Sequence, residues 1–122
     1  MHVLVVDDDL TTRLILNATL TKVGYKVTTV ASGMEALAWL YATPEQPCVI
    51  LLDVLMPGMT GWELLARLRA DVALAAIPVV VITGAVEREI GGSLPEVVAV
   101  IAKPIDVGAL IAVVARCCAG DG

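Results

Sequence analysis

The chain has 122 residues, of which 58% are hydrophobic, and its formal net charge is −5. That length suits one domain (residues 1–122), and no apolar run approaches the ~18 residues that a membrane span needs. The acidic balance and scattered basic residues argue against nucleic-acid binding. Val3–Val6 is typical of a strand where a leader peptide would lie, so we expect a cytoplasmic protein with no membrane partner.

Short apolar runs alternate with amphipathic segments along the whole chain. Five runs predict strands. Most of them are rich in β-branched residues and continuous rather than alternating, which is typical of strands covered on both faces. These predicted strands are Val3–Val6, Lys26–Val30, Val49–Leu52, Val79–Ile82 and Val97–Ile101. Alternation of strands with helices predicts an α/β fold, a (βα)5 doubly wound five-stranded parallel sheet.

The segments between the strands predict helices. In chain order they are Asp9–Val23, Ser32–Tyr41, Thr60–Arg69, a weak Ala85–Leu94 interrupted by paired glycines, and Asp106–Cys118. Capping boxes are expected at Ser32 with Glu35 and at Thr60 with Glu63. Helical spacing predicts the core-facing residues to be Ile15, Leu16, Leu20 and Val23, then Met34, Leu37, Ala38 and Tyr41, then Leu64, Leu65 and Leu68, and last Val107, Leu110, Ile111 and Val114.

Polar residues follow four of the predicted strands where each strand ends. The first strand ends on Asp7 and Asp8, the third on Asp53, the fourth on Thr83 and the fifth, one residue later, on Lys103. In a parallel sheet these ends share one edge, where α/β proteins bind their ligands. We therefore expect three carboxylates, a hydroxyl and an ammonium group to converge there.

The expected group has a definite chemistry. Three carboxylates packed together repel one another unless a cation lies among them, and all-oxygen ligation with room for water suits Mg²⁺. A divalent cation lets an Asp approach an anionic phosphoryl group. Lys103 can contact the phosphoryl oxygens, and Thr83 can donate its hydroxyl to one of them. The group therefore predicts an acyl phosphate formed on an Asp, with Mg²⁺ as cofactor.

Four stretches carry a family resemblance: VLVVDDD, VILLDVLMPGMTG, VVVITGA and VIAKP. In this order, and over the whole chain, the sequence resembles the receiver domain of bacterial two-component response regulators, including stand-alone chemotaxis-type receivers. The resemblance implies the flavodoxin-like strand order 2-1-3-4-5. It also implies that a histidine kinase or histidine phosphotransfer protein phosphorylates Asp53, with Thr83 as the switch hydroxyl and Lys103 as the phosphate contact.

The resemblance implies a metal site as well. Mg²⁺ would be held by Asp7, Asp8, Asp53 and the backbone carbonyl of Leu55, and a cis peptide bond would precede Pro104. Asp9 receives no functional role and is expected to be a surface or capping residue. A receiver is not expected to be an enzyme.

Three features depart from the family pattern. Val100 stands where receivers usually carry Tyr or Phe, three residues before the lysine, and the Ala85–Leu94 segment is shortened. Both departures bear on how the domain signals. The side chains of Leu55 and Ala85, two residues after Asp53 and Thr83, cannot position a hydrolytic water, so the phosphoryl group should be lost slowly.

The number and spacing of the three cysteines do not predict a disulfide framework. Cys48 opens a strand, and Cys117 and Cys118 are adjacent near the end of a helix. The single histidine, His2, is a poor companion for a zinc site. We expect reduced thiols that act as small hydrophobes.

The last predicted helix is apolar nearly all round, with Arg116 the only charge in its body. Outside the core-facing residues it still presents Ala109, Ala112, Val113 and Cys117. A helix of this kind is usually covered, so the face of Ala85–Leu94, Val97–Ile101 and Asp106–Cys118 is predicted to contact a second copy or an effector. A scatter of alanines that needs no partner is the alternative.

Two other functions remain open. Asp7, Asp9 and Thr11 fit the DxDxT nucleophile motif of haloacid-dehalogenase-type phosphatases, although those enzymes need an insertion after the motif, and here a helix follows at once. A receiver-like binding module that works without phosphorylation is the second alternative, because the aromatic residue at position 100 is missing and fold does not fix function.

Overall fold

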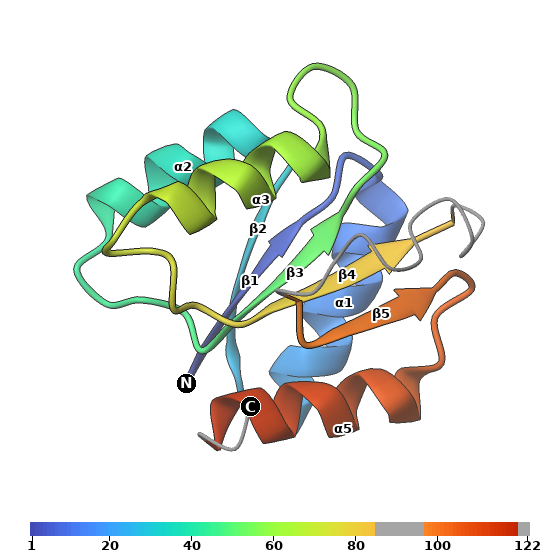
Figure 1. Ribbon diagram of the computed structural model, residues 1–122. Coiled ribbons are helices and arrows are strands. Elements are labelled where there is room, and N and C mark those ends of the chain that lie inside the picture. The colour runs from blue at the N-terminus through green and yellow to red at the C-terminus, as the bar shows by residue number, and fades with distance from the viewer. Residues whose placement is uncertain (85–96, 120–122) are drawn as a thin grey trace.

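The computed structural model describes residues 1–84 and 97–119. The predicted helix Ala85–Leu94 lies outside the described residues. Figure 1 shows a central sheet with helices on both of its faces.

The sheet contains five strands that are all parallel to their neighbours, in the order β2-β1-β3-β4-β5. This confirms the predicted fold class and strand order. The strands are β1 (His2–Val6), β2 (Lys26–Val30), β3 (Val49–Asp53), β4 (Val79–Thr83) and β5 (Ala99–Ala102). The predicted strands agree with these bounds to within one residue at each end, except that the last strand begins at Ala99 rather than Val97.

Four described helices cover the sheet in two layers. Helices α2 (Gly33–Ala42) and α3 (Gly61–Ala70) lie on one face, whereas α1 (Leu10–Val23) and α5 (Val107–Cys118) lie on the other (Figure 1). Successive residues of each inner strand enter opposite layers, as Leu4 and Val5 of β1 do. Burial on both faces is the reason that the inner strands β1, β3 and β4 are almost continuously apolar.

Side-chain caps fix where α2 and α3 begin. Thr60 and Glu63 form the complete predicted capping box at α3, with Thr60 Oγ1 accepting from the Glu63 N–H at 3.2 Å. At α2, Ser32 caps as predicted, but the carboxylate of Glu35 accepts from the N–H of Ala31 rather than from that of Ser32. The second predicted capping box is therefore incomplete.

The predicted core faces of α1 and α2 are partly wrong. Leu16 and Leu20 of α1 and Leu37 of α2 are buried as predicted, together with the unpredicted Thr12, Ala36 and Leu40. The predicted core residues Ile15, Val23, Met34, Ala38 and Tyr41 are exposed instead. Both helices are so rich in apolar residues that more than one stripe satisfies helical spacing, and contact with the sheet selects between them. All three predicted core residues of α3 are buried.

The face of α5 is rotated relative to the prediction. Leu110 and Val114 are buried as expected, but Val107 is 43% exposed and Ile111 is half-buried. Cys117 is buried and Val113 packs partly against the same core cluster, although both were expected on the outer side. Cys117 and Cys118 at the end of the helix are both buried, and the buried side of α5 is therefore shifted toward them.

The cysteines also depart from the prediction. Cys48 and Cys118 form a disulfide across 70 residues of sequence, whereas Cys117 is a free, buried thiol. Helix α5 runs back along the sheet, so its last turn lies beside the start of β3. Reduced thiols were therefore the wrong expectation for two of the three cysteines.

Gly61 opens α3 where the helix passes the end of β3. A Cβ added there would overlap Val54 Cα and lie 2.5 Å from the carbonyl oxygen of Asp53, and both are backbone atoms that cannot rotate away. We expect Gly61→Ala to lower the free energy of unfolding by ~1–3 kcal/mol, measured by urea denaturation.

Gly108→Ala is the matched control, because its Cβ would meet only the Asp106 side chain at 3.4 Å. This substitution should leave stability unchanged or raise it, since Ala is the better helix former. Equal effects of the two substitutions would contradict a steric role for Gly61.

Candidate functional site

Asp7 and Asp8 follow β1 directly. Asp7 is only 2% exposed: its N–H donates to the Val30 carbonyl at 3.1 Å, and its Oδ1 accepts from the Asp9 N–H at 2.8 Å. Asp8 is exposed. The end of β1 therefore presents one carboxylate that is fixed by the backbone and one that faces solvent.

Asp53 ends β3, the strand next to β1, and is 5% exposed. Its Oδ1 accepts from the N–H of Leu55 at 3.1 Å. The pKa of Asp53 is raised to about 6, chiefly by burial and in addition by the Asp7 carboxylate, which outweigh the opposite effects of the Leu55 hydrogen bond and the Lys103 ammonium group.

Lys103 follows β5 and reaches both buried carboxylates. Its Nζ lies 3.1 Å from Asp7 Oδ2 and 3.8 Å from Asp53 Oδ2. Burial opposes the charged form, but the hydrogen bond to Asp7 and the nearby carboxylates raise the pKa of Lys103 overall. The peptide bond to Pro104 is cis, as predicted.

Thr83 ends β4 and is 1% exposed. Asp53 stands beside Ile82 in the β3–β4 register, so Thr83 lies one residue further along the same edge. The Thr83 carbonyl accepts from the N–H of Lys103 at 2.9 Å, which ties the ends of β4 and β5 together. All five side chains that the sequence predicted therefore belong to one edge of the sheet.

The three carboxylates are close enough to share a cation. One oxygen each from Asp7, Asp8 and Asp53 lies within 4.8 Å of the other two. The donors are all oxygen, and Asp8 is exposed enough to leave room for water, which fits Mg²⁺. The backbone carbonyl of Leu55 as a further ligand stays a prediction.

Asp9 caps helix α1. Its Oδ1 accepts from the Thr11 N–H at 3.2 Å and its Oδ2 from the Thr12 hydroxyl at 2.7 Å, and the Thr12 bond lowers the pKa of Asp9. The capping expectation is confirmed. Helix α1 begins at Leu10, so no insertion follows the carboxylates in the way that the phosphatase hypothesis requires.

Arg13 is the residue near the site that the sequence did not single out. Its Nη1 donates to the Asp7 carbonyl at 2.8 Å and so helps to hold the end of β1. No motif predicts this contact, because an arginine seven residues after the end of a strand is usually a surface charge on a helix.

The chain matches known proteins over most of its length. The sequence profile of the response regulator receiver domain matches residues 3–115. Protein PilH of Pseudomonas aeruginosa is 37% identical over 82 residues, which cover 67% of this chain and 66% of that protein. The Vibrio cholerae chemotaxis protein CheY4 has a similar structure, with a TM-score of 0.82 at 32% identity over 94% of this chain and 96% of that one.

A signal receiver domain of a histidine kinase from Syntrophus aciditrophicus is also similar, with a TM-score of 0.87 at 33% identity over 98% of this chain and 90% of that chain. The matches to curated relatives span less than two thirds of their length, down to 18% of the response regulator PleD of Caulobacter vibrioides. None of the helices in residues 1–84 and 97–119 is long and apolar enough to cross a membrane.

The raised pKa of Asp53 predicts how stability depends on pH without divalent cations. A carboxyl group whose pKa is about 6 when folded and 3.8 in its ordinary state favours the folded protein below pH 4, and this contribution is lost as pH rises through 6. Asp53→Asn should therefore be more stable than the wild type, by an amount that grows between pH 4 and 6 to at most ~3 kcal/mol.

Urea denaturation between pH 4 and 8 in the presence of EDTA measures this difference. Asn keeps an oxygen for the Leu55 N–H, so the comparison isolates the charge. A stability difference that does not change with pH would contradict the buried position of the Asp53 carboxylate.

Proposed function

Because this chain belongs to the response regulator receiver family of two-component signalling, we propose that it accepts a phosphoryl group on Asp53. The donor would be a histidine kinase or a histidine phosphotransfer protein. The observation that carries the proposal is the pairing of Lys103 with two buried carboxylates, beside a third that is exposed. This arrangement supplies a nucleophile, a cation for the incoming oxygens and a set of metal ligands.

Asp53 is the carboxylate best suited to attack. It is buried at the end of β3, with Oδ1 held by the Leu55 N–H and Oδ2 3.8 Å from the Lys103 ammonium group. A carboxylate oxygen of Asp53 forms the new bond to phosphorus while the bond from phosphorus to the donor histidine nitrogen breaks. Lys103 then contacts a phosphoryl oxygen, and Thr83 donates its hydroxyl to another.

Asp7, Asp8 and Asp53 would hold Mg²⁺, together with the Leu55 carbonyl. When bound, the cation supplies positive charge that lets the anionic phosphoryl group approach the carboxylates. Asp7 already has Lys103 as a partner, and Asp8 is the exposed member. The two therefore differ in what their loss should cost, since Asp8 has a role only as a ligand.

Substitution of the carboxylates tests these roles. Asp53→Asn should abolish labelling by acetyl phosphate with Mg²⁺, because it removes the nucleophilic oxygen. Asp8→Ala should keep the acceptor and weaken Mg²⁺ binding, so that labelling recovers at higher Mg²⁺ concentration. Acid-labile phosphate measured by intact-mass spectrometry, with Mg²⁺ affinity from calorimetry, gives both quantities.

The same experiment separates the alternatives. Labelling that persists in Asp53→Asn and vanishes in Asp7→Asn would favour the phosphatase chemistry instead. No labelling of the folded wild type would favour a binding module that works without phosphorylation. In a receiver, the exposed Leu55 side chain, which cannot position water, supports slow loss of the phosphoryl group.

The surface of β5 and α5 is proposed as the contact with a second copy or an effector. Strand β5 is at the edge of the sheet, and Val100 and Val107 are 40% and 43% exposed there. Ala109 and Ala112 of α5 are exposed too. Val113 and Cys117, in contrast, belong to the core side and are no part of this surface.

Ala112→Glu adds a charge to this surface without entering the core. Phosphorylated wild type should form dimers in sedimentation velocity, and Ala112→Glu should reduce this association by ~10-fold or more, because an unpaired charge is costly to bury. Ala38→Glu is the matched control, an exposed alanine of α2 on the other side of the sheet. A wild type that stays monomeric would exclude the homodimer and leave an effector as the partner.

A further inference from the structure

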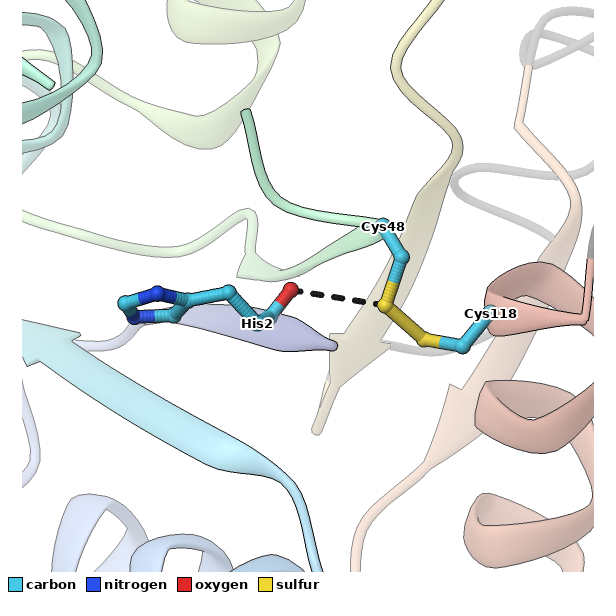
Figure 2. Close-up of a disulfide and its surroundings, with 3 residues drawn as sticks. All are labelled: His2, Cys48 and Cys118. Atoms are coloured by element: carbon cyan, nitrogen blue, oxygen red, sulfur yellow. Dashed lines mark hydrogen bonds between the residues drawn. A yellow bond between two sulfur atoms is a disulfide. The ribbon is translucent and has the colours of Figure 1, made fainter. Parts of the chain in front are cut away.

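The disulfide lies at the edge of the sheet opposite the carboxylates. Cys48 directly precedes β3, whose other end is Asp53, and Cys118 is the last residue of α5 (Figure 2). Their Cα atoms are 4.9 Å apart, which is within the range that a disulfide spans. The link therefore joins a helix end to the sheet at a place remote from the phosphoacceptor site.

The surroundings of Cys48 suit both oxidation states. The Cys48 N–H donates to the His2 carbonyl at 2.8 Å, and Cys48 Sγ lies 3.4 Å from the same oxygen (Figure 2). A sulfur in a disulfide carries no proton, so this second contact becomes a hydrogen bond only when Cys48 is a thiol. The fold thus provides a covalent partner for oxidised Cys48 and an acceptor for reduced Cys48.

The three cysteines differ in their access to reagents in solution. Cys48 is half-buried, whereas Cys117 and Cys118 are only 6% and 5% exposed. Burial also raises the pKa of the Cys117 thiol, which keeps it protonated and unreactive. Cys48 is therefore the thiol that a small reagent reaches first, and Cys118 is the neighbour that can resolve the product.

We propose that Cys48 and Cys118 form a reversible redox site, which reacts with low-molecular-weight disulfides of the glutathione class and fastens the end of α5 to the start of β3. The site is independent of phosphorylation at Asp53. It would add a second covalent modification to the domain, at the opposite edge of the sheet.

The reaction is an ordinary thiol–disulfide exchange in two steps. The Cys48 thiol loses its proton to solvent, and its sulfur attacks one sulfur of glutathione disulfide, so that a Cys48–glutathione bond forms and one glutathione thiolate leaves. The Cys118 thiolate, formed by loss of its own proton, then attacks the Cys48 sulfur and releases the second glutathione. In total, two protein thiols are oxidised and one glutathione disulfide is reduced to two glutathione thiols.

Closure of the link should stabilise the domain. The loop that it closes spans 70 residues and contains β3, α3, β4, β5 and most of α5. A cross-link over so long a loop restricts the unfolded chain strongly. The oxidised protein should therefore unfold at a higher temperature, and amide exchange in the last turn of α5 should be slower than in the reduced protein.

The full chain equilibrated with reduced and oxidised glutathione gives the test. Non-reducing peptide mass spectrometry should find Cys48 linked to Cys118 and Cys117 free, and Tm should be higher in the oxidised sample by roughly 10 °C. Cys118→Ala should instead accumulate glutathione on Cys48 and lose the dependence of Tm on redox state. Cys117→Ala is the matched control, since this equally buried neighbour should keep both the link and the Tm shift.

Cys48→Ala provides a second variant in case Cys118→Ala folds poorly, because position 48 is less buried. This variant should take up no glutathione on Cys118 while folded. Free thiols throughout the glutathione series, a link through Cys117, or the same redox-dependent Tm shift in either Ala variant at positions 48 and 118 would each overturn the proposal.

Discussion

The ion pair between Lys103 and Asp7 is the interaction on which the site depends. Two carboxylates at the ends of neighbouring central strands are almost fully buried, and burying such charges without compensation is costly. Lys103 follows β5, which β4 separates from β3 and β1. Its side chain nevertheless reaches both carboxylates, with Nζ 3.1 Å from Asp7 and 3.8 Å from Asp53. The ammonium group compensates Asp7 more closely than Asp53, and this asymmetry agrees with the raised pKa of Asp53.

Because all strands of the sheet are parallel, the carboxylate site and the disulfide lie at opposite ends of the strands. All carboxyl ends of the strands lie at one edge, which gathers Asp7, Asp53, Thr83 and Lys103. The opposite edge receives the end of α5 and with it Cys118, which meets Cys48 at the start of β3. Strand β3 thus carries Asp53 at one end and directly follows Cys48 at the other.

The strands and the position of the site could be predicted from the sequence because each strand and the polar residue after it are neighbours in the chain. A strand buried on both faces is continuously apolar, and the polar residue that follows it marks the edge where Asp7, Asp53 and Lys103 meet. Helix faces were harder to predict: Met34 and Tyr41 fit helical spacing as well as Ala36 and Leu40 do, and only the sheet decides which pair is buried. The Cys48–Cys118 link was missed because sequence spacing contains no information on which helix end returns to which strand.

The absence of an aromatic ring at position 100 limits the routes by which a change at Asp53 could displace β5. Val100 lies on the edge strand, is 40% exposed and carries no ring. The backbone offers a direct connection instead, because the Lys103 N–H donates to the Thr83 carbonyl at 2.9 Å. A displacement of Thr83 must therefore either move Lys103 with it or break that bond. The Lys103 side chain also pairs with Asp7 and approaches Asp53. Lys103 therefore connects β5 to the site in two ways, through its backbone hydrogen bond to Thr83 and through the charge of its side chain.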